Sequence, residues 1–250
     1  RQLRRYGADV VGVKCDGEGI VPEELERTLT DLGGRGKKVK YLYTIPTFQN
    51  PLGWTMTLER RRQVLDITRK YRVPVFEDDC YVDLRFAGED VTSFHSLDDA
   101  GQVIYVGSFS KIIAPGVRMG YLVATEEVIL RAMSFKGGGG VNQLAALAIE
   151  EYLRHDMYQH IDQQNRSLLA KRDAMLTALG DYFPPSCSWN RPTGGMMVWV
   201  RLPEGADTWA ALERAVEADV KYNPGPVFRA DRTGNNFLRL TYSHNTPEEI

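Results

Sequence analysis

The segment with the clearest capacity for chemistry is SFSKIIAPGVRMG, residues 108–120. Lys111 follows two serines, Ser108 and Ser110, and precedes Arg118 by seven residues, in a stretch that is otherwise apolar and turn-forming. A lysine in such a loop is either a solvated surface residue or an amine held in a pocket, where it can act as a nucleophile or a base. The segment alone leaves both interpretations open.

Polar side chains of different chemistry lie at the ends of three predicted strands or directly after them. They are an amide, a carboxylate, a phenol and the lysine amine, carried by Asn50, Asp78, Tyr81 and Lys111. In open α/β sheets, ligands bind beyond the carboxyl ends of the strands. If these strand ends are neighbours, the four side chains converge on one crevice.

Short apolar runs alternate with helical patterns through the first half of the chain. The apolar runs predict strands at residues 10–15, 39–46, 73–79, 102–108 and 118–125. Apolar residues at helical spacing predict helices at residues 22–33 and 57–72. Because the strands are almost continuously apolar, they favour a parallel or mixed sheet covered by helices, and the predicted fold class is α/β.

The pattern changes after the glycine run KGGGGVN. From there on, helices are predicted at residues 142–154, 156–180 and 208–218, and strands at residues 194–202 and 236–243. This order is typical of a smaller α+β domain. We therefore expect a large domain in residues 1–155 and a small C-terminal domain in residues 156–250.

The two ends of the sequence look like interrupted helices. The first residues, RQLRRYG, are typical of a last helical turn closed by glycine, and the last, NTPEEI, of a first turn. We therefore expect the sequence to be a piece of a longer protein that lacks its N-terminal part.

The bulk composition argues against several classes of function. The formal net charge of −2 favours neither nucleic acid nor an anionic membrane as a partner. No apolar run approaches the roughly 20 residues of a membrane helix. The three separated cysteines and the four histidines lack disulfide or metal-site spacing, so we expect a cytoplasmic protein without a metal. The basic run ERRRQ, residues 59–63, is expected to be a solvated helix face.

Four segments occur in the order and spacing of a known family. They are PTFQNPLG, EDDCY, SFSKIIAPGVRMG and LRLTY. Together they resemble the fold type I, pyridoxal-phosphate-dependent aminotransferases of class I/II. The resemblance is greatest to the branch that contains kynurenine and 2-aminoadipate aminotransferases and the aminotransferase-like domains of MocR regulators. It implies a large cofactor-binding domain followed by a smaller one.

The resemblance implies that Lys111 forms a Schiff base with the cofactor aldehyde and then moves the substrate α-proton. It implies that an acid pairs with the pyridine nitrogen of the cofactor. Asp78 is assigned this role because it lies three residues before Tyr81, which is the family's spacing. Alternation along a strand then turns Glu77 and Asp79 the other way.

Further cofactor ligands follow from the same resemblance. Asn50 and Tyr81 are expected to hydrogen-bond the phenolic oxygen of the cofactor. Ser108, Ser110 and Arg118 are expected to bind its phosphate, for which charge-assisted donors are suited.

In the second domain, Arg239 resembles the arginine that binds the substrate α-carboxylate bidentately, with Asn50 beside it. The family's glycine-containing phosphate loop and its ring-stacking aromatic residue have no counterpart in the sequence. The substrate's side chain is therefore not predicted.

The predicted function is transfer of the amino group of an L-amino acid to a 2-oxo acid, in a homodimer. One alternative is the ligand-sensing domain of a MocR/GntR-type transcription regulator, which would keep the cofactor without turnover. A third possibility is lyase or decarboxylase chemistry on the same scaffold. The sequence does not separate these possibilities.

Overall fold

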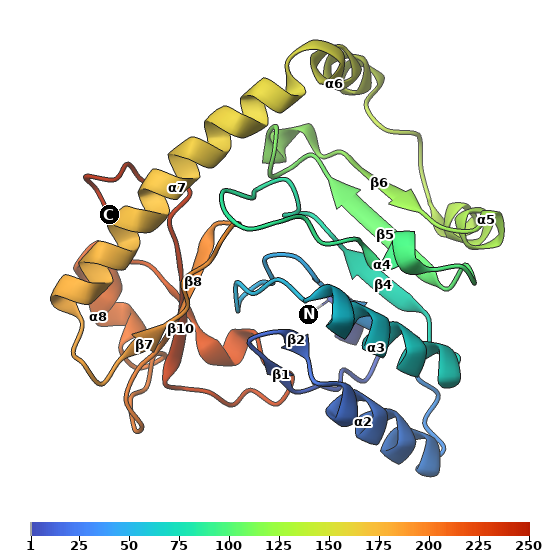
Figure 1. Ribbon diagram of the computed structural model, residues 1–250, viewed down its shortest axis with the longest axis horizontal. Helices are drawn as coiled ribbons and strands as arrows, with labels where there is room; N and C mark the ends of the chain where they lie inside the picture. Colours follow the sequence, from blue (N-terminus) through green and yellow to red (C-terminus); the bar gives the residue numbers. More distant parts are fainter. Residues whose placement is uncertain (1) are drawn as a thin grey trace.

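A four-stranded mixed sheet forms the first half of the computed structural model, which describes residues 2–250 (Figure 1). The spatial order is β3–β4–β5–β6, and the bounds are Leu42–Thr44, Val75–Asp78, Val103–Ser108 and Gly120–Val123. Strands β3, β4 and β5 are parallel, whereas β6 runs antiparallel to β5. Four of the five strands predicted in this half are therefore present, in shorter form.

Three helices pack against one face of this sheet. They are α2 (Pro22–Gly34), α3 (Leu58–Lys70) and α4 (Phe94–Leu97). Helix α3 begins where the Thr57 side chain accepts a hydrogen bond from the Arg60 amide. Apolar residues of these helices, of the sheet and of the adjoining segments form one buried cluster, made by Ile20, Leu25, Leu29, Met56, Val64, Leu65, Val73, Val75, Phe94 and Val103.

A second, smaller sheet lies beside the first and is reached through the long helix α7 (Met157–Tyr182) (Figure 1). Its strands lie in the order β7–β8–β10–β9, with bounds Ser188–Trp189, Met197–Arg201, Phe237–Thr241 and Asn223–Pro224. Helix α6 (Gln143–His155) precedes α7, and α8 (Leu212–Glu217) lies between β8 and β9. The predicted helices at residues 142–154 and 156–180 are confirmed.

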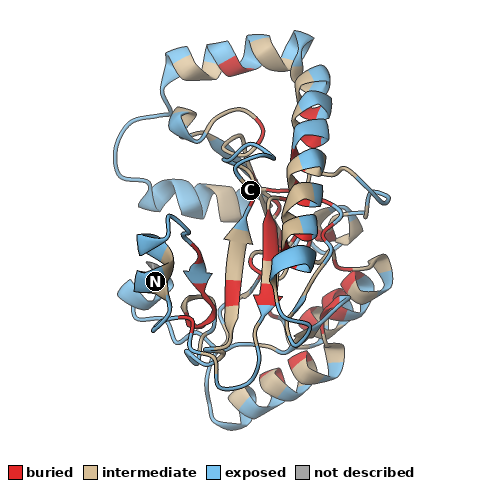
Figure 2. Cartoon of the chain, turned by 90° about the vertical axis from the view of Figure 1, so that its left-hand side faces the viewer, coloured by how far each residue is buried: buried red, intermediate tan, exposed pale blue. Residues whose placement is uncertain are grey.

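A second buried cluster joins the two sheets. Phe48, Tyr81 and Leu84 of the first half pack with Met197 and Tyr242 of the second. Figure 2 shows buried residues along the strands and on the sides of the helices that face them. The division at residues 155 and 156 falls next to the start of α7 and remains a prediction.

Some sequence predictions were wrong in detail. Residues 10–14 are not a strand; Cys15–Asp16 (β1) instead pairs with Gly19–Ile20 (β2) in a small hairpin. The Asp16 side chain accepts a hydrogen bond from the Glu18 amide, which stabilises the turn. The helix predicted at residues 208–218 is shorter, and the last residues, NTPEEI, form turns rather than a helix.

Two helices were not predicted. One is the short α4, and the other is α5 (Glu126–Phe135), which follows β6 and has no buried residue. Two acidic residues in its first turn, after Thr125, were the available signal. The remaining short elements are α1 (Gln2–Arg5) and the 3₁₀ turns Pro115–Val117 and Gly225–Val227. Among the described residues, no helix is long and apolar enough to cross a membrane.

Candidate active site

The parallel strands bring the predicted site residues to one edge of the first sheet. Asp78 is the last residue of β4, and Ser108 is the last residue of β5. In the ladder between these strands Asp78 lies opposite Val106, two residues before Ser108. The loop with Asn50 follows β3, the other neighbour of β4. The expected convergence of strand ends is therefore present.

The three acids in a row at the end of β4 have different surroundings. Asp78 is half-buried, whereas Glu77 and Asp79 are both buried. The Asp78 Oδ2 atom accepts a hydrogen bond of 2.6 Å from the hydroxyl of Tyr43 in β3. Because successive side chains along a strand point to opposite faces, Asp78 faces away from Glu77 and Asp79, as predicted.

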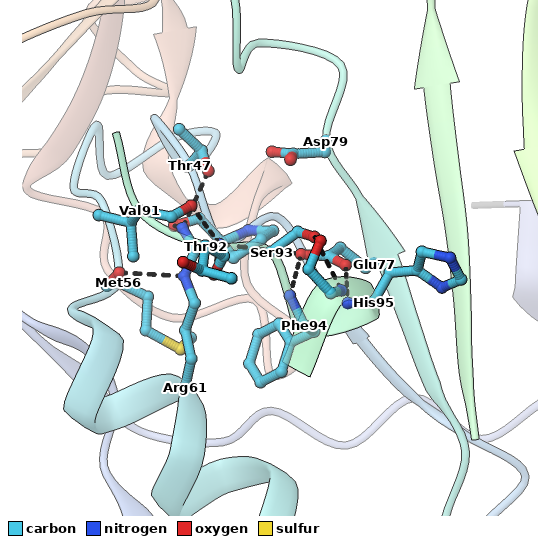
Figure 3. A network of polar contacts seen from close by, with 12 residues as sticks. Thr47, Met56, Arg61, Glu77, Asp79, Val91, Thr92, Ser93, Phe94 and His95 are labelled. Carbon is cyan, nitrogen blue, oxygen red and sulfur yellow. Dashed lines mark hydrogen bonds and ion pairs between the residues drawn. The ribbon is translucent and has the colours of Figure 1, made fainter. Parts of the chain in front are cut away.

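Glu77 is held by helix α4 on the helix-covered side of the sheet (Figure 3). Its carboxylate accepts hydrogen bonds from the amides of Phe94 at 2.8 Å and His95 at 2.9 Å. Burial nevertheless raises the pKa of Glu77 to about 7, because it outweighs these hydrogen bonds and the nearby guanidinium of Arg61.

The prediction that ERRRQ is a solvated helix face is wrong for Arg61. Its side chain is fully buried, and Nη1 lies 3.8 Å from Glu77 Oε1. The guanidinium donates to the carbonyl oxygens of Met56 and Pro46 and to the hydroxyl of Thr47 (Figure 3). A buried carboxylate needs a nearby cation and hydrogen bonds, which is why one arginine of the run turns inward.

Asn50, Tyr81 and Arg239 form a chain of polar contacts across the two sheets. The Asn50 Nδ2 atom donates to the Tyr81 hydroxyl at 3.5 Å, and Arg239 Nη1 donates to Asn50 Oδ1 at 2.8 Å. The peptide bond between Asn50 and Pro51 is cis. Burial raises the pKa of Tyr81 to about 12, so its phenol stays protonated and can donate a hydrogen bond to a ligand.

The Arg239 guanidinium has a hydrogen-bond donor that the described residues leave without an acceptor. Its guanidinium lies 4.9 Å from the centroid of the Phe228 ring, and burial lowers its pKa without removing its charge. The Nε atom is buried and has no hydrogen-bond partner among the described residues. A buried donor of this kind is suited to an anionic ligand.

Lys111 lies in the turn after β5, beside the phenol. Its Nζ atom is 5.9 Å from the centroid of the Tyr81 ring. The backbone oxygen of Lys111 accepts a hydrogen bond of 2.8 Å from Gln164 Nε2 in α7. Gln164 therefore fixes the lysine's backbone from the long helix, a role that no local pattern around residue 164 indicated.

The three predicted phosphate ligands line one pocket of about 400 Å³. Ser108, Ser110 and Arg118 are joined there by Gly107 and Gly120. The Ser110 amide donates to Ser108 Oγ at 3.2 Å, so the two serines share a tight turn. Among the described residues, neither Lys111 nor Asp78 lines this pocket.

The loop that carries Arg118 has an uncommon backbone. Arg118 has a φ of 50°, in the left-handed region, after a 3₁₀ turn that contains Pro115 and Gly116. Its Nη1 atom donates to the Pro115 carbonyl oxygen at 3.3 Å. The turn folds the chain back toward the serines, which line the same pocket as Arg118.

Comparison with known proteins adds an independent observation. A family model described as aminotransferase class I and II matches residues 1–250. Aromatic-amino-acid aminotransferase 1 of Thermococcus litoralis is 40% identical over 99% of this chain and 60% of its own length. An uncharacterized HTH-type transcriptional regulator of Bacillus subtilis is 29% identical over 98% of this chain and 50% of its own length.

A solved structure is similar in three dimensions as well. The kynurenine aminotransferase of Pyrococcus horikoshii, crystallised in complex with PMP, has a TM-score of 0.91 and 38% sequence identity. The match covers 96% of this chain and 60% of that one, so the chain spans about 60% of the length of these aminotransferases. The chain belongs to the class I and II aminotransferase family and has its fold type I architecture.

Proposed function

We propose that the protein is a pyridoxal-phosphate-dependent aminotransferase that moves the amino group of an L-amino acid to a 2-oxo acid. The observation that carries the proposal is the contact chain from Arg239 through Asn50 to Tyr81, with Lys111 beside the phenol. Together these contacts support a site that combines a carboxylate-binding cation, an amine and cofactor-binding groups.

The residues present fit pyridoxal phosphate. The pocket at Ser108, Ser110 and Arg118 offers hydroxyl and guanidinium donors, which a phosphate dianion requires. Asp78 offers a carboxylate for the ring nitrogen, and the protonated phenol of Tyr81 offers a donor for the ring oxygen. These groups are of the chemical types that the polar positions of the cofactor require.

The buried Nε of Arg239 offers one more donor, which suits the carboxylate of an amino acid. This unpartnered atom supports a substrate site beside the cofactor site, because a buried guanidinium nitrogen without an acceptor is costly.

The site residues have different tasks in this proposal. Pyridoxal phosphate, when bound, supplies an aldehyde that condenses with amines and a ring that withdraws electrons from the substrate α-carbon. Lys111 supplies the amine that binds this aldehyde and the base that moves the α-proton. Asp78 keeps the ring nitrogen protonated by accepting its hydrogen bond.

The remaining residues bind and orient. Asn50 and Tyr81 bind the phenolic oxygen of the cofactor, and Arg118 with the two serines anchors the phosphate. Arg239 holds the substrate carboxylate with two parallel hydrogen bonds, which fixes the α-carbon in place for proton transfer.

The partners are part of the same proposal. The similarity to an aromatic-amino-acid aminotransferase and to a kynurenine aminotransferase favours aromatic amino acids among the donors. We propose a homodimer as the working assembly. The three cysteines are free thiols, which supports a reducing, cytoplasmic location.

The match to a transcription regulator supports a second candidate function, a cofactor-binding sensor domain. Both functions require Lys111 and Asp78, and they differ in whether the bound cofactor changes its chemical form after an amino acid binds. A spectroscopic half-reaction separates them.

The test uses the full-length protein loaded with pyridoxal phosphate, in the absence of any oxo acid. Visible absorption is recorded before and after addition of phenylalanine, kynurenine and 2-aminoadipate. Conversion of the visible band to the pyridoxamine phosphate form establishes an aminotransferase. A band that shifts without conversion indicates a sensor.

The control variants are Lys111→Ala and Lys136→Ala. Lys136 is exposed and directly follows α5, so its variant should behave as the parent does. Lys111→Ala should lose the protein-bound visible band while circular dichroism stays unchanged. If it transaminated at the parent rate, the proposed function would be wrong.

A further inference from the structure

We infer that Tyr43 is a positioning residue for Asp78, holding one carboxylate oxygen so that the other is presented to the cofactor ring nitrogen. The inference rests on the proposed function, because it concerns how Asp78 acts on that cofactor. The observation that carries it is the hydrogen bond of 2.6 Å from the Tyr43 hydroxyl to Asp78 Oδ2.

The register of the sheet explains why these two residues meet. Strands β3 and β4 are parallel, and Tyr43 lies opposite Phe76. Asp78 comes two residues after Phe76, so it projects from the same face of the sheet as Tyr43. The long phenol side chain spans the diagonal to the end of the neighbouring strand, where a shorter side chain would stop short.

The tyrosine ring is held in this orientation by its neighbours on the sheet. Its centroid lies 6.0 Å from that of Phe76, with an interplanar angle of 31°. The Tyr41 ring also packs against Phe76, with ring centroids 5.8 Å apart. Although Tyr43 is 47% exposed as a residue, its hydroxyl is bound at the site edge rather than left to solvent.

The hydroxyl can act only as a donor toward Asp78. Burial, followed by the hydrogen bond to Asp78, raises the pKa of Tyr43, so the phenol is protonated at any working pH. Burial, followed by the nearby Asp78 carboxylate, raises the pKa of the Cys80 thiol to about 12, so this neighbour is neutral as well. The Tyr43 hydroxyl is thus the donor that holds the carboxylate.

This contact has one physical consequence for the site. It fixes the rotation of the Asp78 carboxylate, so that this side chain need not be ordered when the cofactor binds. Without the hydroxyl, Asp78 remains present but is a poorer partner for a protonated ring nitrogen.

The test compares Tyr43→Phe with Tyr41→Phe in the full-length protein. Both variants keep the aromatic ring on Phe76, and only Tyr43 contributes a hydrogen bond to Asp78. Three quantities are measured: the dissociation constant of pyridoxal phosphate, the ¹⁵N chemical shift of the ring nitrogen in labelled cofactor, and kcat with KM for an amino acid.

For Tyr43→Phe we expect the ring-nitrogen signal to move toward the unprotonated value. The cofactor dissociation constant should rise and kcat should fall, each roughly 10-fold, with KM little changed. Tyr41→Phe should match the parent in all three quantities. A merely structural role of Tyr43 would lower the thermal midpoint and leave the nitrogen shift unchanged.

Two failures are distinguishable. If the parent binds pyridoxal phosphate with a protonated ring nitrogen and Tyr43→Phe gives the same shift, the role of Tyr43 is wrong and the proposed function stands. If the parent itself shows no protonated ring nitrogen, the assignment of Asp78 fails, and the role of Tyr43 fails with it.

Discussion

Arg239 in β10 and Asn50 after β3 are 189 residues apart in sequence, and the Arg239 Nη1 atom lies 2.8 Å from Asn50 Oδ1. This hydrogen bond ties the smaller sheet to the loop that follows the first strand of the larger one. Asn50 in turn contacts the phenol of Tyr81. The proposed substrate-binding cation is thereby positioned relative to the proposed cofactor ligands by direct contact.

Arg239→Lys should weaken substrate binding while the protein stays folded. A lysine keeps the charge but cannot form two parallel hydrogen bonds to a carboxylate, so KM for the amino acid should rise about 10- to 100-fold. The pyridoxal phosphate dissociation constant should change much less. Steady-state kinetics and a cofactor titration check both expectations.

Arg229→Lys is the matched control, because Arg229 is an exposed arginine that pairs with Asp231 in a nearby loop. An equal rise of KM in both variants would show that Arg239 has no special role in binding the carboxylate.

Arg118→Ala should reduce the preference for a phosphorylated cofactor. In the parent protein, pyridoxal phosphate should bind much more tightly than pyridoxal, because Arg118 lines the pocket with two serines. The variant should lower that ratio of affinities roughly 10- to 100-fold, the effect of one charge-assisted hydrogen-bond donor. Arg131→Ala, at an exposed site on α5, should leave the ratio unchanged. A ratio that Arg118→Ala did not alter would remove this residue from the phosphate site.

Candidate residues that have chemistry of their own can be selected from the sequence. Asn50, Tyr81 and Lys111 follow strands whose apolar pattern is local, and Asp78 ends one, so both the strand and the residue can be recognised in a short window. The parallel arrangement of β3, β4 and β5 then brings them together. The helical spacing of apolar residues in α3 and α7 is equally local, and those two helices were predicted.

The residues that support them could not be predicted in the same way. Arg61 lies in a run of charged residues whose pattern is that of a surface helix, and only the fold turns one of them toward Glu77. Tyr43 and Gln164 act through partners 35 and 53 residues away. Contacts of this kind depend on strand register and helix packing, which no short window of sequence contains.

Glu77→Gln should change how stability depends on pH. Folding raises the pKa of Glu77 from 4.5 to about 7, so between these values the folded state binds more protons than the unfolded state. The stabilisation from this group is complete below about pH 4.5 and is lost as the pH rises through about 7. Relative to the variant, the parent should lose up to about 3 kcal/mol of unfolding free energy across this window.

Urea denaturation of parent and variant at pH 5 and pH 8 measures this difference. Glu59→Gln, at an exposed position of the same helix that carries Arg61, should show no such pH dependence relative to the parent. A gap between parent and Glu77→Gln that is the same at both pH values would contradict the raised pKa.

Gly194→Ala should destabilise the protein and disturb the site. A Cβ atom at Gly194 would overlap the ring of Phe48 and the carbonyl oxygen of Leu84. Neither neighbour can move freely, because Phe48 is fully buried and the Leu84 atom belongs to the backbone. We expect a loss of about 2–3 kcal/mol in unfolding free energy. Since Phe48 lies two residues before Asn50, cofactor affinity should fall as well.

Gly180→Ala is the opposite case and serves as the control. Gly180 lies within α7, and a Cβ atom there would meet nothing within 4 Å. Alanine stabilises a helix relative to glycine, so the unfolding free energy should rise by roughly 0.5–1 kcal/mol, with cofactor binding unchanged. Urea denaturation and a cofactor titration measure both variants. If Gly194→Ala were as stable as the parent, the close packing of Phe48 between the two sheets would be wrong.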